Sequence, residues 1–292
     1  MFNPLHHFPA LFAPRAPDSH KGDHGTLAIL GGAAGMSGAI VLAASAALIS
    51  GCGRVFAAFC QPALPAPWIA GYPEIMLATA RDIFERDTID TWAIGCGLGT
   101  DSAAHAALAR LIDHCHTRAQ PLLLDADALN LLAQDPALAA RLAAANILKI
   151  LTPHPGEAAR LLGSSARAIN AQRDASALAL AERYCAWIVL KGQHSRIASP
   201  DGRCFTNPSG NAALATAGSG DVLTGIIAAL LAQRIPVEQA VRGGVWLHGA
   251  AADHFLHRGV PLAGLLAGEI APAARQLRQR LAAEIISKNK QK

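Results

Sequence analysis

The sequence predicts an α/β fold, a three-layer α/β/α sandwich around a mainly parallel central sheet. Short apolar runs typical of buried strands alternate with helical segments along the chain, as expected for a parallel sheet with helices on both faces. Hydrophobic residues make up 52% of the 292 residues and charged residues only 16%, which favours a large buried core over disorder. No repeat or linker divides the chain, so we expect a single domain over residues 1–292.

The elements expected in the first half follow from apolar runs punctuated by glycine and proline. Residues 1–20 come before the first apolar run, and we interpret them as an N-terminal extension or a loose first turn. The predicted elements are then a strand at Thr26–Leu30, a helix at about Met36–Ser50, a strand at Arg54–Phe59, a proline-rich loop at Gln61–Pro73, a buried strand with a glycine-rich turn at Trp92–Gly99, and a helix at Ala103–Thr117.

The second half continues the same alternation. The dipeptide Asp201-Gly202 lies between two short strand-like runs and predicts a hairpin. The predicted elements are a strand at the start of Pro121–Asn130 that turns at Asp125 and Asp127, a strand, turn and helix over Ile147–Gly163, a helix at Asn170–Cys185, a strand at Trp187–Gly192, the hairpin at Arg196–Thr206, helices at Ser219–Gln233, Val237–His257 and Leu265–Lys288, and a basic tail at 287–292.

The charge of the chain argues against nucleic acid as a partner. The net charge is +4, from 25 basic and 21 acidic residues, and part of the excess lies in the tail at Lys288, Lys290 and Lys292. A nucleic-acid binder usually carries a concentrated basic stripe, and none is visible here. A modest attraction for small anions is compatible with this balance.

Several features predict a cytoplasmic protein without membrane association. The first residues lack the basic start of a signal peptide and are broken by prolines. The stretch Gly25–Gly53 has no charged side chain, but its continuous apolar part, Ala39–Ser50, is too short to cross a bilayer. The six cysteines show no C-x-x-C pair, which fits a reducing compartment.

Polar or glycine-rich clusters fall where the predicted strands end. In open parallel sheets, ligands bind at the carboxyl ends of the strands, so these clusters predict a common site. They are Gly31–Gly38, Gly95–Gly99, Asp125–Asn130, Thr152–Glu157, Lys191–Ser195 and Gly218–Asp221.

The segment Ala217–Asp221 has the sequence AGSGD and precedes a strongly apolar helix. A glycine-rich turn at a helix start leaves backbone N–H groups free to bind an anion, and Gly218 and Gly220 let a phosphate approach the main chain. Asp221 in the first turn can accept a proton from an attacking hydroxyl. The simpler alternative is an ordinary helix N-cap with a favourably placed acidic residue.

This turn resembles the nucleotide-binding signature of ribokinase-like enzymes, in which the Asp is the catalytic base and the turn is the anion hole. Further motifs, in the same order, resemble the NAD(P)H-hydrate dehydratases of that superfamily. The resemblance covers roughly residues 20–275 and rests on His20–Gly32, Gly35–Ala39, Gly95–Gly99, Asp125–Asn130, Leu151–Gly163 and Val189–Gly192.

The resemblance implies a nucleotide site and a neighbouring substrate site. The residues it places at the nucleotide are Lys191, Gly192, Gln193, His194, Ser195, Gly218, Ser219 and Gly220. The residues it places at the substrate are Ala39, Gly99, His154 and Asp221, with Asp221 catalytic. Asp127 and Asn130 stay open, since Asp127 can equally be a helix N-cap. Glu157 is a candidate to hold Mg²⁺ through water, because this hard cation prefers oxygen ligands.

The activity implied by the resemblance is that of a lyase on a kinase scaffold. Asp221 takes the proton of the C6 hydroxyl of hydrated NADH or NADPH, the hydroxyl attacks the terminal phosphate of ADP or ATP, and phosphate then leaves as the double bond returns. Stand-alone bacterial members imply ADP as the donor. Only the S epimer is expected to react, which implies a separate NAD(P)H-hydrate epimerase, and the family suggests a homotetramer.

Two other functions stay open on the sequence. The first is a ribokinase-like kinase that phosphorylates a vitamin precursor alcohol. Such kinases tend to show Asn-x-x-Glu where this chain has His154-x-x-Glu157, which argues against that function. The second is a nucleotide-binding regulatory protein without turnover, which the presence of Asp221 beside the glycine-rich turn disfavours.

Overall fold

The computed structural model describes residues 2–259 and 263–289, with side chains up to residue 284, and confirms the α/β prediction. The strands of these residues form one sheet in the order β3-β2-β1-β4-β5-β6-β7-β8-β9. All neighbours from β3 to β7 pair in parallel, and β8 and β9 add the predicted antiparallel hairpin at one edge. The strands are β1 (Thr26–Gly31), β2 (Arg54–Phe59), β3 (Met76–Thr79), β4 (Thr91–Ile94), β5 (Leu122–Leu124), β6 (Lys149–Leu151), β7 (Trp187–Leu190), β8 (Arg196–Ala198) and β9 (Cys204–Thr206).

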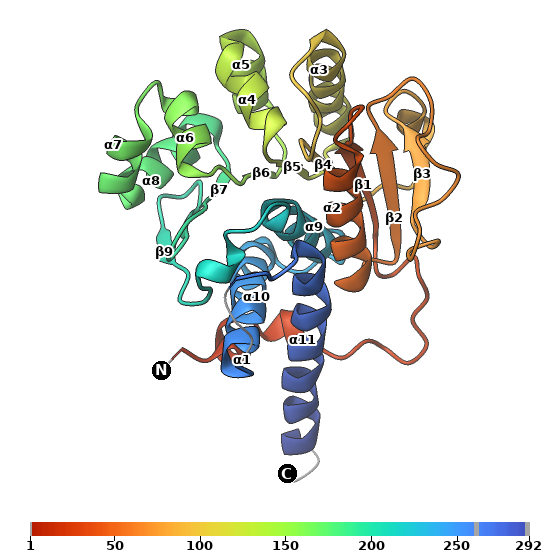
Figure 1. Cartoon of the computed structure of the whole chain (residues 1–292), viewed down its shortest axis with the longest axis vertical. Helices are drawn as coiled ribbons and strands as arrows, with labels where there is room; N and C mark the ends of the chain where they lie inside the picture. Colours follow the sequence, from red (N-terminus) through yellow and green to blue (C-terminus); the bar gives the residue numbers. More distant parts are fainter. Residues whose placement is uncertain (1, 260–262, 290–292) are drawn as a thin grey trace.

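The helices form the two outer layers of the sandwich. In Figure 1, α3 to α8 lie above the sheet and α2, α9, α10 and α11 lie below it. Their bounds are α1 (Pro4–His7), α2 (Ser37–Ile49), α3 (Ser102–Arg118), α4 (Asp127–Gln134), α5 (Pro136–Ala144), α6 (Pro155–Leu162), α7 (Ala166–Ala171), α8 (Arg173–Tyr184), α9 (Ser219–Ala232), α10 (Val237–His257) and α11 (Ala267–Asn289), with short 3₁₀ turns η1 (Pro9–Phe12), η2 (Asp82–Glu85) and η3 (Ala212–Leu214).

Each face of the sheet has its own hydrophobic core. Successive residues of a strand point to opposite faces. In β1, Leu27 and Ile29 belong to the core shared with α2, α9, α10 and α11, whereas Ala28 and Leu30 belong to the core beneath α3 to α8. A strand buried on both faces must be apolar at every position, which explains the continuous apolar runs in the sequence.

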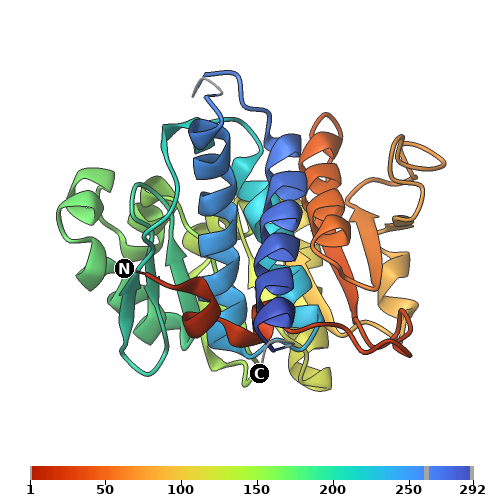
Figure 2. The same cartoon turned by 90° about the horizontal axis from the view of Figure 1, so that it is seen from below.

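Residues 4–12 of the N-terminal segment pack against the rest of the domain and form α1 and η1, two short elements that were not predicted. α1 and η1 lie across α10 and α11 (Figure 2), and Phe8, Leu11 and Phe12 are at most 2% exposed. The Phe12 ring meets Trp246 of α10 edge-on, with ring centroids 6.3 Å apart. The burial of these apolar side chains holds the short segment in place. The segment is too short to show a periodic pattern in the sequence.

We expect Phe12→Ala to lower the free energy of unfolding by about 3–5 kcal/mol, because it deletes a buried aromatic ring and leaves a cavity. Urea unfolding followed by circular dichroism measures this loss. Asp18→Ala changes an exposed residue of the same segment and should shift stability by less than about 0.5 kcal/mol. Equal stabilities of the two variants would show that the segment does not belong to the core.

Other differences from the expected elements are local. Neither β3 nor η2 was predicted in the residues after the proline-rich loop. The helices α4, which begins at Asp127 within the segment predicted as a strand and turn, and α5 were also missed. Asn170–Cys185 is not one helix. Gln172, at φ −134° and ψ 55°, separates α7 from α8, and α7 begins at Ala166.

The remaining sequence predictions about the surface and compartment are tested only in part. Within residues 2–259 and 263–289, no helix combines the length and hydropathy needed to cross a membrane. All six cysteines are free. The proposed basic tail, with Lys288, Lys290 and Lys292, lies outside the residues whose side chains are described.

Candidate active site

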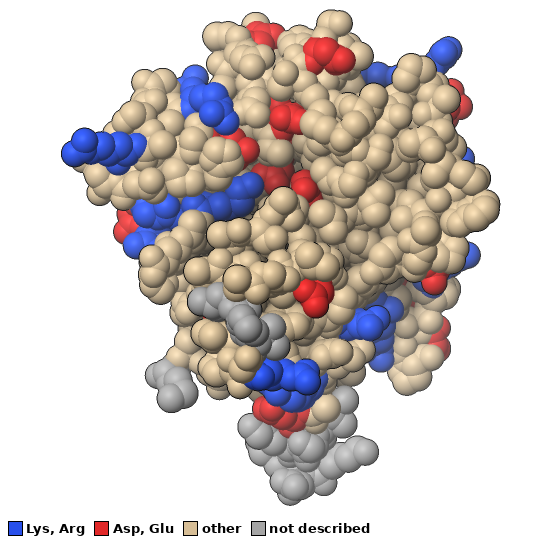
Figure 3. All heavy atoms as spheres, in the orientation of Figure 1, with Lys and Arg blue, Asp and Glu red and all other residues tan. Residues whose placement is uncertain are grey.

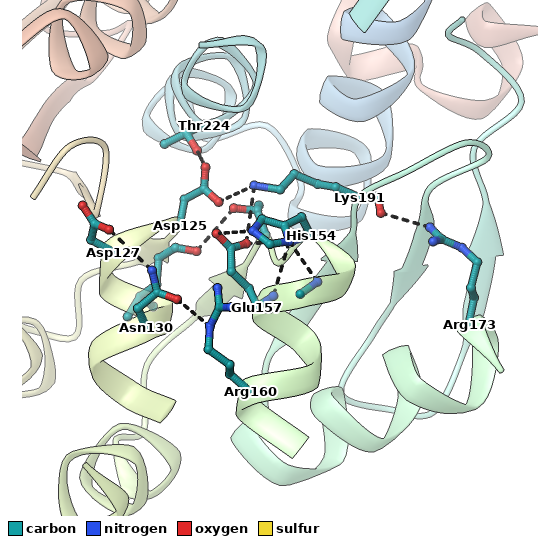
Figure 4. Close-up of polar contacts among 12 residues, drawn as sticks. Asp125, Asp127, Asn130, His154, Glu157, Arg160, Arg173, Lys191 and Thr224 are labelled. Carbon is teal, nitrogen blue, oxygen red and sulfur yellow. Dashed lines mark hydrogen bonds and ion pairs between the residues drawn. The ribbon is translucent and has the colours of Figure 1, made fainter. Parts of the chain in front are cut away.

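The polar clusters of the sequence do meet at the carboxyl ends of the parallel strands. Figure 4 shows Asp125 after β5, His154 and Glu157 after β6 and Lys191 after β7 converging on one region, with Thr224 of α9 above them. In the space-filling view, acidic atoms gather in a hollow at the centre of this face, and basic atoms enter it from one side (Figure 3).

The glycine-rich turn forms the start of α9. Gly218 is the N-cap residue and has a left-handed backbone with φ 85° and ψ −5°, and no side chain caps the helix. A Cβ atom at Gly218 would lie 2.3 Å from Leu42 Cδ1 of α2, a side-chain end that can shift, so the left-handed backbone is the main reason why the position favours glycine. The N–H of Ser219 donates to the Thr216 carbonyl (3.3 Å), and the N–H groups of Gly220 and Asp221 are available to an anion.

Asp221 lies in the first turn of α9, and Gly218 is the N-cap. This position also agrees with the simpler alternative, an ordinary helix start with a favourably placed acidic residue, so that alternative stays open on position alone. Burial raises the pKa of Asp221 to about 6, and the charges of Asp125 and Asp127 add to this, while the Cys96 thiol and Lys191 act in the opposite direction. A carboxylate with a pKa near neutrality is suited to general base catalysis.

Lys191 lies between two carboxylates. Its Nζ is 2.6 Å from Asp125 Oδ1 and 3.9 Å from Glu157 Oε2. Burial acts to lower the pKa of Lys191, but these carboxylates outweigh burial and raise it, so the side chain is a cation. The same Nζ would lie 3.4 Å from a Cβ atom at Gly220, which places the ammonium beside the anion-binding turn.

His154 is the N-cap of α6, a role that the sequence did not indicate. Its Nδ1 accepts hydrogen bonds from the N–H groups of Gly156 (2.9 Å) and Glu157 (3.3 Å), and Glu157 Oε2 accepts from the N–H of His154 (2.7 Å). Since Nδ1 accepts, the geometry assigns the proton to Nε2. Burial and the nearby Lys191 lower the His154 pKa, which favours this neutral form.

Glu157 is a buried carboxylate whose negative charge is incompletely balanced. Burial raises its pKa to about 7, although Lys191 opposes the shift. Among the described residues, no group of three or more His, Cys, Asp or Glu is arranged to bind a metal ion. Mg²⁺ commonly uses one or two carboxylates together with phosphates and water, so Glu157 fits such an ion without a larger protein ligand set.

A cavity of about 570 Å³ opens beside the turn. Eight of the residues assigned to the nucleotide or substrate line it, namely Lys191, Gly192, Gln193, His194, Ser195, Ser219, Gly220 and His154. Gly218, Ala39, Gly99, Glu157 and Asp221 do not. The cavity is large enough for a nucleotide.

The far wall of this cavity was not predicted as part of the site. It is built by the loop from Asn207 to Thr216 and by Val245, His248 and Gly249 of α10. Asp253 holds the loop, since it accepts hydrogen bonds from Gly210 N–H (2.8 Å) and Asn211 Nδ2 (3.0 Å). The only signal in the sequence is the Gly, Ser and Asn content of the loop.

The two small residues predicted at the substrate lie together near Met36. A Cβ atom at Gly99 would be 3.8 Å from Met36 Cε, and one at Gly97 would be 3.0 Å from Ala39 Cβ and 2.9 Å from Met36 Cβ. Met36 is 41% exposed, so this apolar corner is open to solvent. Small residues here leave room for a ring to approach the backbone.

Asp127 and Asn130 belong to a hydrogen-bonded chain behind that corner. Asp127 Oδ2 accepts from Gly99 N–H (2.9 Å), Asn130 Nδ2 donates to Asp127 Oδ1 (3.4 Å), and Arg160 Nε donates to Asn130 Oδ1 (2.9 Å). Asp127 is the first residue of α4 and Ala126 is its N-cap, so the N-cap alternative for Asp127 is wrong. These contacts fix the glycine-rich turn after β4.

Comparisons with known proteins agree with this geometry. A family model described as NAD(P)H-hydrate dehydratase matches residues 27–273. The ADP-dependent (S)-NAD(P)H-hydrate dehydratase of Neisseria meningitidis is 55% identical over 274 residues, which cover 94% of this chain and 92% of that protein. The bifunctional NAD(P)H-hydrate repair enzyme Nnr of Vibrio cholerae is 39% identical over 92% of this chain, but the match spans only 52% of that protein.

Solved structures give the same result. The ADP/ATP-dependent NAD(P)H-hydrate dehydratase of Bacillus subtilis, co-crystallised with ATP/Mg²⁺, superposes with a TM-score of 0.81 at 32% identity and covers 94% of this chain and 96% of that one. A ribokinase-like superfamily protein of Enterococcus faecalis gives 0.78 at 27% identity, with 93% and 94% of the two chains covered. The fold is thus ribokinase-like, as expected, and the chain belongs to the NAD(P)H-hydrate dehydratase family.

Proposed function

We propose that this chain is an ADP-dependent dehydratase that converts the S epimer of hydrated NADH or NADPH back to the reduced cofactor. The observation that carries the proposal is the position of Asp221, which lies in the uncapped first turn of α9. Asp221 interacts electrostatically with Lys191, which lines the nucleotide cavity, and with Asp127, which accepts a hydrogen bond from Gly99 N–H in the apolar corner. A base between two binding sites suits transfer of phosphate from one ligand to the other.

The chemistry then follows from the residues around Asp221. Its carboxylate accepts the proton of the substrate C6 hydroxyl, whose oxygen forms a bond to the terminal phosphorus as the bond to the nucleotide breaks. The N–H groups at Gly218–Gly220 and the Lys191 ammonium stabilise the charge on the transferring phosphate. Phosphate then leaves from C6 with electrons supplied by the ring nitrogen, a proton leaves C5, and the 5,6 double bond returns.

The roles of the other site residues are part of this proposal. Gly192, Gln193, His194 and Ser195 would border the nucleotide, since they line its cavity. Ala39, Gly99 and His154 would contact the hydrated nicotinamide; His154 Nε2 lies 3.3 Å from Glu157 Oε1. Glu157 would hold Mg²⁺ through water, and the ion when bound supplies positive charge at the phosphates.

ADP is proposed as the donor because the relative in Neisseria meningitidis is named for it. The Bacillus subtilis neighbour is named for both ADP and ATP. The bifunctional relatives suggest an epimerase as the partner activity. The homotetramer and the cytoplasmic location stay predictions. Light scattering after size-exclusion chromatography can test the number of subunits.

The direct test is to mix purified protein, Mg²⁺ and S-NADH-hydrate with ADP or ATP and to follow the return of reduced-nicotinamide absorbance. A nucleotide-dependent rise with release of phosphate is expected, and it identifies the donor. No rise with either nucleotide would refute the dehydratase assignment. A stable phosphorylated alcohol instead of a restored cofactor would favour the alternative, a small-molecule kinase.

The pH dependence of the reaction should report Asp221. Its pKa of about 6 means that the carboxylate is mostly protonated at pH 5 and mostly ionised above pH 7. A general base works only when ionised, so kcat/KM should rise with pH between about 5 and 8, the range in which Asp221 and the neighbouring Glu157, with a pKa of about 7, both ionise. Initial rates between pH 5 and 8 measure it. A flat profile over this range would exclude a base with a pKa near 6.

A further inference from the structure

The carboxylate of Asp125 joins two segments that lie far apart in the sequence. Its Oδ1 is 2.6 Å from Lys191 Nζ, and its Oδ2 accepts a hydrogen bond of 2.9 Å from Thr224 Oγ1 (Figure 4). Asp125 is 1% exposed and Thr224 is fully buried. Both oxygens of the carboxylate therefore have a fixed partner, which defines its rotation about the side-chain bond.

Thr224 lies one helical turn after Asp221 in α9 and does not line the nucleotide cavity. Its buried hydroxyl donates to Asp125, which in turn contacts Lys191 of the cavity wall. A hydrogen bond to an ionised acceptor is stronger than one between neutral groups. The buried Thr224–Asp125 bond is therefore well suited to hold the carboxylate in one orientation.

Lys191 needs such an anchor because its ammonium is carried on a flexible four-carbon stem. The anchored Nζ lies beside Gly220 of the anion-binding turn, where a Cβ atom would be 3.4 Å from Nζ and 3.7 Å from Asp125 Oδ2. An ammonium held there in advance loses little freedom when a phosphate arrives.

We propose that Thr224 is a positioning residue that orients Asp125 and thereby holds the Lys191 ammonium in place for the transferring phosphate. The proposal rests on the nucleotide-dependent function above. It assigns Thr224 no contact with substrate or nucleotide. α9 then carries the base, Asp221, and also fixes the cation that acts on the phosphate.

Matched variants separate the hydroxyl from the packing of the side chain. Thr224→Val keeps the shape and removes the hydroxyl, whereas Thr224→Ser keeps the hydroxyl. We expect Thr224→Val to lower kcat/KM for ADP about tenfold, the effect of losing one hydrogen bond to a charged group, while KM for the hydrate is unchanged. Thr224→Ser should restore most of the loss. Thr224→Ala serves in place of Val if the Val variant does not fold.

A double-mutant cycle tests whether the effect passes through Lys191. Calorimetry measures ADP affinity for wild type, Thr224→Val, Lys191→Met and the double variant. Thr224→Val should weaken binding in the wild-type background and change it little when Lys191 is already Met. If Thr224→Val weakened ADP binding equally in both backgrounds, or changed KM equally for ADP and the hydrate, the positioning role of Thr224 would be overturned. The proposed function would not be affected by that result. A wild-type protein that binds neither ADP nor ATP would instead refute the proposed function.

Discussion

Asp221→Asn should lower kcat by about 10³-fold, within the range expected for loss of a general base. The amide has nearly the same shape as the carboxylate but cannot accept the proton of the C6 hydroxyl. The uncapped N–H groups of α9 and the Lys191 ammonium are unchanged, so affinity for ADP should stay within a few fold. Initial rates together with calorimetric binding of ADP measure the two effects separately.

Asp87→Asn provides the control, since it replaces an exposed carboxylate that pairs with Arg118 on the surface. Its kinetics should equal those of the wild type. Asp221→Asn should fold normally, because it removes a partly buried charge rather than a packing contact. If Asp221→Asn turned over at the wild-type rate, another group would have to be the base.

Gly225→Ala should destabilise the protein by about 3 kcal/mol, at the upper end of the cost of overpacking. A Cβ atom at Gly225 of α9 would lie 2.1 Å from the Ala43 carbonyl oxygen and 2.9 Å from its carbon, both in the backbone of α2. Backbone atoms cannot rotate away, so the two helices must separate. This cost exceeds the gain of up to about 1 kcal/mol from replacing glycine by alanine in a helix.

Gly268→Ala is the matched control, because Gly268 is also helical and a Cβ atom there meets no other atom within 4 Å. It should leave the thermal midpoint nearly unchanged, whereas Gly225→Ala should lower it by several degrees. The separation of helices in Gly225→Ala should also reduce activity, since α2 carries Ala39 and α9 carries Asp221. Equal midpoints for the two variants would contradict the close packing of α2 and α9.

Elements buried on both faces of the sheet could be predicted nearly to the residue. β2 coincides with the predicted Arg54–Phe59. The strand begins directly after Gly53, and its apolar run at residues 55–59 is buried on both faces of the sheet, so the run itself marks the strand. β3, at the opposite extreme, has four residues at the edge of the sheet, and only Ala78 of them is fully buried. Partial burial leaves no periodic pattern, so sequence analysis missed it.

The parts of the site that follow a strand and contain glycine or charged residues could be predicted. The parts that depend on contacts between residues far apart in the sequence could not. Lys191, Ser219 and Gly220 were predicted by motif and line the same cavity. The loop wall depends on Asp253, 43 residues beyond Gly210, and such a pairing has no local signal. The capping role of His154 was missed because helix caps are usually Ser, Thr, Asp or Asn.

The packing of the N-terminal segment against the final helix also affects how the chain folds during synthesis. Arg278 Nε of α11 donates a hydrogen bond of 2.6 Å to the Leu11 carbonyl, across 267 residues of sequence. On the ribosome, the apolar side chains of residues 8–12 must wait for nearly the whole domain to be translated before their partners exist. Contacts of such long range slow folding and leave early intermediates with exposed apolar surface, so we expect this segment to be a site of chaperone binding on the nascent chain.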